Sequence, residues 1–201
     1  MDRTKTTDRK KATDTRKLVL LALLTAMVVV LQLLGSFIRF GQFSISLVLM
    51  PIVVGAALIG VYAGGWLGLA FGIVVLLSGD ATVFLMINVP ATIFVVLLKG
   101  TLAGLAAGAV YKALENKNKT VAAISAAAVC PLVNTAVFIA GVYAFFLPTI
   151  TEWGAAAGAV NATAFIFLGL VGANFLFELI LNLILSPVIV RLIQYGQDRR
   201  S

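Results

Sequence analysis

A lysine and a glutamate lie deep inside apolar stretches of this chain, where an ionised side chain is costly. Lys99 stands about nine residues, or roughly 13 Å at helical rise, from the start of its apolar stretch. Glu178 lies about midway along a second stretch, and Asn174 and Asn182 share its helix face through a spacing of four residues. Charged groups at such depth face a cavity or an opposite charge rather than lipid. These side chains are therefore candidates for binding a polar ligand or for pairing with one another.

Asn134 and Thr135 add polar groups near the middle of a third apolar stretch, at a depth similar to that of Lys99 and Glu178. One interpretation is an ion pair between Lys99 and Glu178 that only fixes the register of the helices. The other is a pocket for a small polar solute. We favour the pocket because several donors and acceptors at matched depth exceed what one ion pair requires.

The elements that position these groups are predicted to be membrane-spanning helices. Of the 201 residues, 61% are hydrophobic and 11% are charged, which leaves too little polar surface for a water-soluble domain. Most apolar stretches reach about 17 residues, enough to cross roughly 30 Å of hydrocarbon as helices. We predict an all-α membrane protein whose single six-helix transmembrane domain, 18–195, lies between a basic tail, 1–17, and a short C-terminal tail, 196–201. The six predicted transmembrane helices are 18–35, 45–63, 64–78, 91–114, 120–146 and 164–193.

The distribution of basic residues predicts that both termini are cytoplasmic. Thirteen of the fifteen lysines and arginines lie in the 1–17 tail, in the stretch 112–119 or near the C-terminus. Such clusters mark the cytoplasmic side of membrane helices. This topology puts the loop that holds Arg39, and the polar segment that holds Asn88, on the outer side. The chain is thus predicted to be a multi-pass protein of a cell membrane, surrounded by lipid.

The residue inventory excludes several classes of function. The chain has no histidine and a single cysteine, Cys130, which rules out histidine-based catalysis, an internal disulfide and a four-cysteine zinc site. It has no G-x-x-x-x-G-K phosphate loop, so any ATP that drives it must be hydrolysed by another protein. Its basic residues collect at the ends of apolar stretches rather than in a nucleic-acid-binding patch. We expect no enzyme activity, no cofactor, no metal site and no nucleic-acid partner.

Three rows of small residues at a spacing of four predict close contacts between helices. The rows are Gly64, Gly68 and Gly72; Gly100, Gly104 and Gly108; and Ala22 with Ala26. We expect the glycine rows to pack inside the protein, with a tight turn at Gly64 and Gly65 between the second and third helices. The alanine row lies on the first helix, which follows a solvated tail and is expected at the periphery of the protein. Its small side chains can let a partner protein pack closely against this helix.

The segment ALLTAM, which contains Ala22 and Ala26, resembles the alanine-x-x-x-alanine pattern on the first helix of a known family. That family comprises the substrate-binding S components of energy-coupling factor transporters, which take up vitamins in bacteria and archaea. This chain also resembles these S components in its size, its six predicted helices and its basic tail. Within the family, SISLVLMPIVVGAALIGVYAGGWLGLAFGIVVLLSG and PLVNTAVFIAGVYAFF resemble the pantothenate type.

The resemblance implies a prokaryotic subunit that binds and takes up a small water-soluble vitamin, with pantothenate as the first candidate. The alanine row would face a transmembrane coupling subunit, which is itself held by two ATPase subunits. The loops after the first and third helices, with Arg39 and Asn88, would close over a vitamin bound from outside.

The resemblance also implies roles for the deep polar residues. Lys99 would pair with the carboxylate of pantothenate, and Asn134, Asn174 and Asn182 would hydrogen-bond its hydroxyl and amide groups. Glu178 would pair with Lys99 or accept a hydrogen bond from a ligand hydroxyl. Because Glu178 is acidic, a neutral or cationic vitamin precursor is also an open alternative.

An autonomous ion-coupled secondary transporter is the alternative function. In that case Glu178 would carry a proton or a cation across the membrane, and transport would need no ATPase. Such transporters usually contain an inverted repeat, which is not clear in this sequence.

Overall fold

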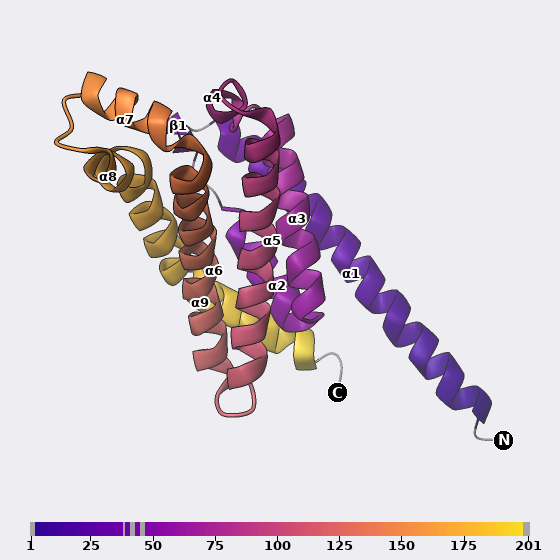
Figure 1. Cartoon of the computed structure of the whole chain (residues 1–201). Coiled ribbons are helices and arrows are strands. Elements are labelled where there is room, and N and C mark those ends of the chain that lie inside the picture. The colour runs from indigo at the N-terminus through magenta and orange to yellow at the C-terminus, as the bar shows by residue number, and fades with distance from the viewer. Residues whose placement is uncertain (1–2, 38, 41–42, 45–46, 199–201) are drawn as a thin grey trace.

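The computed structural model describes residues 3–37, 39–40, 43–44 and 47–198, and these are almost entirely helical (Figure 1). The elements in chain order are α1 (Arg3–Phe37), β1 (Arg39–Phe40), β2 (Phe43–Ser44), α2 (Leu49–Leu58), α3 (Val61–Leu77), α4 (Thr82–Leu85), α5 (Val89–Leu114), α6 (Lys119–Gly141), the π-helix η1 (Val142–Phe146), α7 (Leu147–Ala156), α8 (Ala162–Ala164), the π-helix η2 (Phe165–Gly172) and α9 (Ala173–Asp198). The strands β1 and β2 form a two-residue antiparallel hairpin. The prediction of a helical membrane protein is confirmed.

Four helical segments are long and apolar enough to cross a membrane. They are Asp14–Ser36, Val89–Leu114, Lys119–Ala156 and Ala162–Tyr195. The helices α2 and α3 are also apolar but shorter. Together these segments correspond to the six predicted helices, and how many of them cross the membrane stays a prediction.

Both ends of the described chain lie toward the same end of the bundle as the connection between α5 and α6 (Figure 1). Figure 1 shows the start of α1, the end of α9 and that connection toward one end of the bundle, with α4 and α7 at the other. The arrangement agrees with a common side for the two termini. That this side is cytoplasmic stays a prediction based on the basic residues.

The connection between α2 and α3 differs from the prediction. The chain turns at Ile59 and Gly60, and Gly60 has a φ of 137°, which glycine adopts without steric cost. The predicted turn at Gly64 and Gly65 is wrong, because both residues are buried inside α3. Paired glycines suit a tight turn and a close helix contact equally, so the sequence pattern did not separate the two.

The predicted external segments contain helices. The segment 79–90 includes α4, and the segment 147–161, predicted as a loop, includes α7. Pro148 lies in the first turn of α7, where its missing N–H leaves no hydrogen bond unmade. These short helices cover one end of the bundle (Figure 1).

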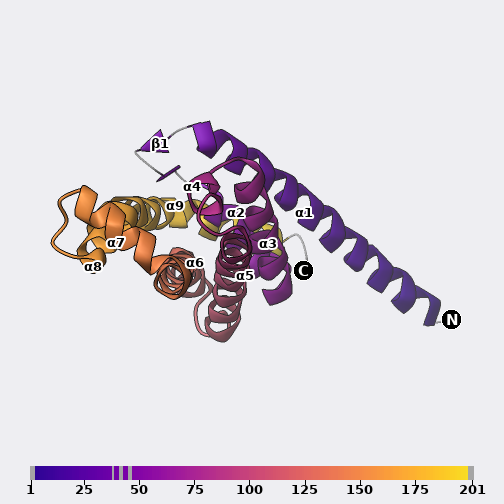
Figure 2. The same ribbon diagram turned by 45° about the horizontal axis from the view of Figure 1, so that its top comes forward.

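Helix α1 runs along the edge of the bundle and extends beyond it at its N-terminal end (Figures 1 and 2). The predicted tail, 1–17, is helical from Arg3 and continues into the apolar part of α1 without a break. In the most apolar window of α1 only 22% of the residues are buried, against 39% for α5. Most of this helix is therefore available to lipid or to another protein.

Helices α3 and α5 pack against each other through the two glycine rows. A Cβ atom added at Gly64 or Gly68 would overlap the backbone carbonyl of Gly104 or Gly100, respectively. The reverse is also true, since a Cβ at Gly104 would overlap the carbonyl of Gly64. The expectation that the glycine rows pack inside the protein is confirmed. Their missing side chains allow the two backbones to touch.

A leucine at Gly104 should disrupt this contact. Because the new side chain meets backbone rather than a movable side chain, we expect Gly104→Leu to lose more than about 3 kcal/mol of stability. That corresponds to a melting temperature lowered by roughly 10 °C in detergent. Ala109→Leu adds the same side chain to an exposed position of α5 and should leave the melting temperature within about 2 °C. Equal melting temperatures for the two variants would contradict the packing described.

Candidate functional site

A cavity of about 110 Å³ lies between α1, α3, α5, α6 and α9. Most of its wall is apolar, and several polar side chains also line it. The polar lining residues are Gln32, Asp80, Thr92, Lys99, Asn134, Thr135 and Glu178. A cavity whose wall is mostly apolar, with a few placed polar groups, is typical of a site for a small molecule.

Four of the predicted site residues meet at this cavity. Lys99 reaches it from α5, Asn134 and Thr135 from α6, and Glu178 from α9. The structure therefore brings these four side chains to one cavity, and their role in ligand binding stays a prediction. Apolar helices hold them there, since each polar side chain escapes lipid only by turning toward the inside of the bundle.

The ammonium group of Lys99 lies in a mixed aromatic and anionic environment. Its Nζ stands 5.2 Å from the centroid of the Phe138 ring, within the range of a cation–π contact. Two carboxylates attract it, Glu178 more strongly and Asp80 less. The cavity thus places the amine of Lys99 beside an aromatic ring and two carboxylates.

Asn134 presents an unsatisfied acceptor at the cavity. Its side chain is 7% exposed, and its Oδ1 has no hydrogen-bond partner within the described part of the chain. Buried amide oxygens without a donor are uncommon in folded proteins, because desolvating them costs free energy. This atom is the polar group of the wall whose hydrogen bonding is left incomplete.

Two other predicted ligand residues lie elsewhere. Asn88 is exposed and caps α5, where its Oδ1 accepts a hydrogen bond from the Ala91 amide at 3.0 Å. Asn182 is buried, but it is not part of the lining, and its Nδ2 donates to the Glu178 carbonyl oxygen at 2.8 Å. The spacing of four that puts Asn182 on the face of Glu178 also puts it one turn deeper, past the cavity.

The side chains of Arg39 and Asn174 lie outside the described part of the structure. The backbone of Arg39 belongs to β1 and that of Asn174 to α9. Their predicted roles in ligand binding stay predictions.

Sequence reasoning missed a hydrogen bond that joins α1 to the segment before α4. Gln32 is 2% exposed and its Nε2 donates to Oδ2 of Asp80 at 2.6 Å, and both residues line the cavity. Thr92 was missed as well, and its hydroxyl donates to the Asn88 carbonyl oxygen at 2.7 Å. The available signal was Gln32 itself, a polar residue inside the apolar stretch of α1.

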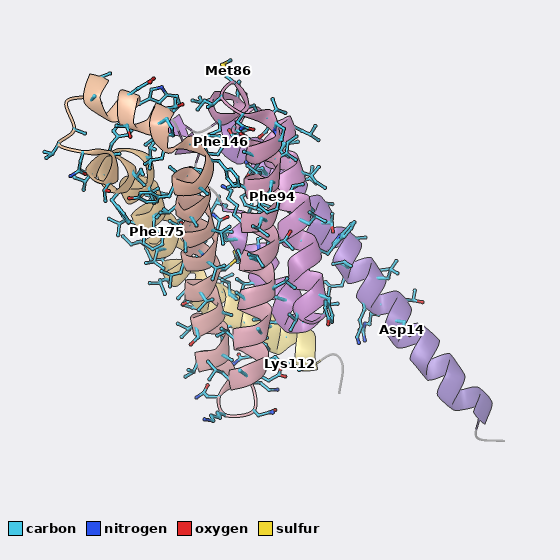
Figure 3. All side chains as sticks on the ribbon, viewed as in Figure 1. Asp14, Met86, Phe94, Lys112, Phe146 and Phe175 are labelled. Atoms are coloured by element: carbon cyan, nitrogen blue, oxygen red, sulfur yellow. The ribbon has the colours of Figure 1, made fainter. Side chains whose placement is uncertain are left out.

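Aromatic rings form the remaining cover of the cavity. Phe84 in α4 makes edge-to-face contacts with Phe138 at 5.5 Å and Phe146 at 5.2 Å, and its centroid lies 6.2 Å from that of Trp153 in α7. Figure 3 shows Phe146 nearer than Phe175, another lining residue, to the end of the bundle that carries α4 and α7. Phe84 therefore links the two short helices above the cavity.

The fold and this cavity define a helical membrane protein with an internal polar site. A family model for the substrate-specific component of ECF transporters matches residues 16–190. Because the match spans most of the chain, the protein belongs to this family, as the ALLTAM resemblance predicted. The family consists of substrate-specific transporter subunits rather than enzymes. No curated protein and no solved structure matches the chain.

Loss of the Gln32 to Asp80 hydrogen bond should loosen the segment around α4. We expect Gln32→Leu to cost about 1.5–3 kcal/mol, because a buried bond to a carboxylate is lost. Hydrogen–deuterium exchange in 79–88 should rise accordingly. Thr25→Val removes the exposed bond that Trp66 donates at 3.3 Å and should leave exchange in that segment unchanged. Unaltered exchange in Gln32→Leu would show that this bond does not hold the segment.

Proposed function

We propose that this chain captures a small water-soluble vitamin in the cavity from the outer side of the membrane. The observation that supports the proposal is the position of Lys99, a basic side chain in the wall of a cavity between apolar helices. Holding a lysine at that depth is costly unless a counter-charge or a ligand uses it. Separate ATPase subunits would supply the energy for uptake, since the sequence has no phosphate loop.

Pantothenate is the ligand to test first, on the strength of the sequence resemblance. It is a monoanion, and Lys99 is the cation of the lining that would pair with its carboxylate. The phenylalanine rings around the lysine would pack against the apolar part of the ligand. Glu178 and Asp80 would help to keep Lys99 at the cavity.

The cover over the cavity would act as a lid. Phe84 sits on a helix of only four residues and contacts the rings of Phe138 and Phe146. Movement of α4 away from Phe138 and Phe146 would open the cavity toward the outer end. The hairpin that contains Arg39 would close the same end from the side of α1.

The alanine row would bind the transmembrane coupling subunit. Ala22 and Ala26 are both exposed on α1, the helix at the edge of the bundle. Small side chains let the backbone of a partner helix approach closely, and in lipid such packing is a main source of helix association.

Binding should depend on Lys99. We expect saturable binding of pantothenate, or of another vitamin in a B-vitamin panel, by the purified chain without any partner. Lys99→Met should weaken the binding by about 10- to 100-fold through loss of a charged contact. Lys112→Met is the matched control, since Lys112 is exposed near the other end of α5 (Figure 3). Tryptophan fluorescence in a Trp66→Phe background reports on Trp153 alone, beside the lid.

Failure of the wild-type chain to bind any vitamin in a folded sample would overturn the proposal and favour the ion-coupled transporter. Equal affinities for Lys99→Met and the wild type would remove the lysine from the binding site.

Binding of the coupling subunit should depend on the alanine row, Ala22 and Ala26, and not on the cavity. With both alanines replaced, Ala22→Leu and Ala26→Leu, we expect unchanged vitamin affinity but loss of co-purification with the coupling subunit and of ATP-driven uptake. Met27→Phe is the control, because Met27 is 44% exposed and about 100° around the helix from Ala26. Uptake that survives the double substitution would place the partner surface elsewhere.

A further inference from the structure

Asn134 combines three properties that rarely occur together without a ligand. It lines the cavity, its side chain is 7% exposed, and its Oδ1 has no hydrogen-bond donor among the described residues. Leucine has nearly the same size and shape, and the neighbouring positions of α6 are largely apolar. An asparagine there lowers the stability of the empty protein relative to leucine, because a buried acceptor is left without a donor.

Two donors of the wall already have partners other than Oδ1 of Asn134. The hydroxyl hydrogen of Thr92 is committed to the Asn88 carbonyl, and Nε2 of Gln32 donates to Asp80. Carboxylates such as Glu178 only accept hydrogen bonds when ionised. The hydroxyl of Thr92 and Nε2 of Gln32 are thus already used, and Lys99 is the basic side chain of the lining.

We propose that Oδ1 of Asn134 accepts a hydrogen bond from the transported ligand, and that the ligand is a small acid that carries a hydroxyl or amide N–H donor. The acid group binds Lys99, and the donor completes the hydrogen bonding of Asn134. The inference rests on the proposed function, because it assigns a contact within the same site. It also makes the donor a requirement for recognition, since an analogue without it leaves the asparagine unsatisfied.

The test compares stability without ligand and affinity with ligand for Asn134→Leu. Without ligand, we expect the variant to melt about 3 °C higher than the wild type, because the unsatisfied acceptor is gone. With pantothenate as the probe, and then the vitamin panel, we expect at least about tenfold weaker binding.

Asn182→Leu is the matched control for this experiment. Asn182 has the same unsatisfied Oδ1 and is 3% exposed, but it is not part of the cavity lining. Its affinity for the probe should stay within about threefold of the wild type. A loss of affinity as large as that of Asn134→Leu would overturn the proposal, since the effect would then not need contact with the ligand.

The remaining outcomes are also decisive. A lower melting temperature for Asn134→Leu, or an unchanged affinity, overturns the proposal and makes Asn134 a structural residue. If Asn134→Leu does not fold, the affinity of Asn134→Ala decides by the same tenfold criterion. If the wild type binds no vitamin, the proposed function fails separately.

Discussion

Contact between the backbones of α3 and α5 is the constraint on which the rest of the structure depends. It exists because Gly64 and Gly68 face Gly104 and Gly100 without side chains between them. Lys99 precedes Gly100, and a step of one residue turns a side chain by about 100° around a helix. Once Gly100 is fixed against α3, Lys99 is directed to the adjacent cavity rather than to lipid. The glycine contact thereby positions the cation of the site.

The cavity gathers polar groups from several helices because the surrounding hydrocarbon offers them no partners. Gln32, Lys99 and Glu178 lie on three different helices, yet each turns toward the same space. Their mutual attraction and hydrogen bonding stabilise the arrangement of the helices. Oδ1 of Asn134 has no hydrogen-bond partner among the described residues, and this observation is the basis of the ligand contact proposed above.

The two ends of the bundle are built differently. Toward the α5–α6 connection the helices are regular, whereas the other end carries the π-helices η1 and η2 and the short helices α4, α7 and α8. The π-helices contribute Phe146 and Leu170 to the cavity wall. Such irregular turns are less stable than α-helix and recur at functional sites. The regular half thus supports the fold, and the irregular half forms much of the site and its cover.

The sequence by itself determined the membrane environment, most of the helices and the convergence of Lys99, Asn134, Thr135 and Glu178. Apolar length and the cost of burying charge depend only on residue type and spacing, which the sequence contains. Tertiary structure decided which glycines turn the chain, that Asn88 caps a helix, that Asn182 lies past the cavity, and that Gln32 meets Asp80. These outcomes depend on how far each helix is rotated and shifted against its neighbours. Contacts between residues distant in sequence set those quantities, and local patterns do not contain them.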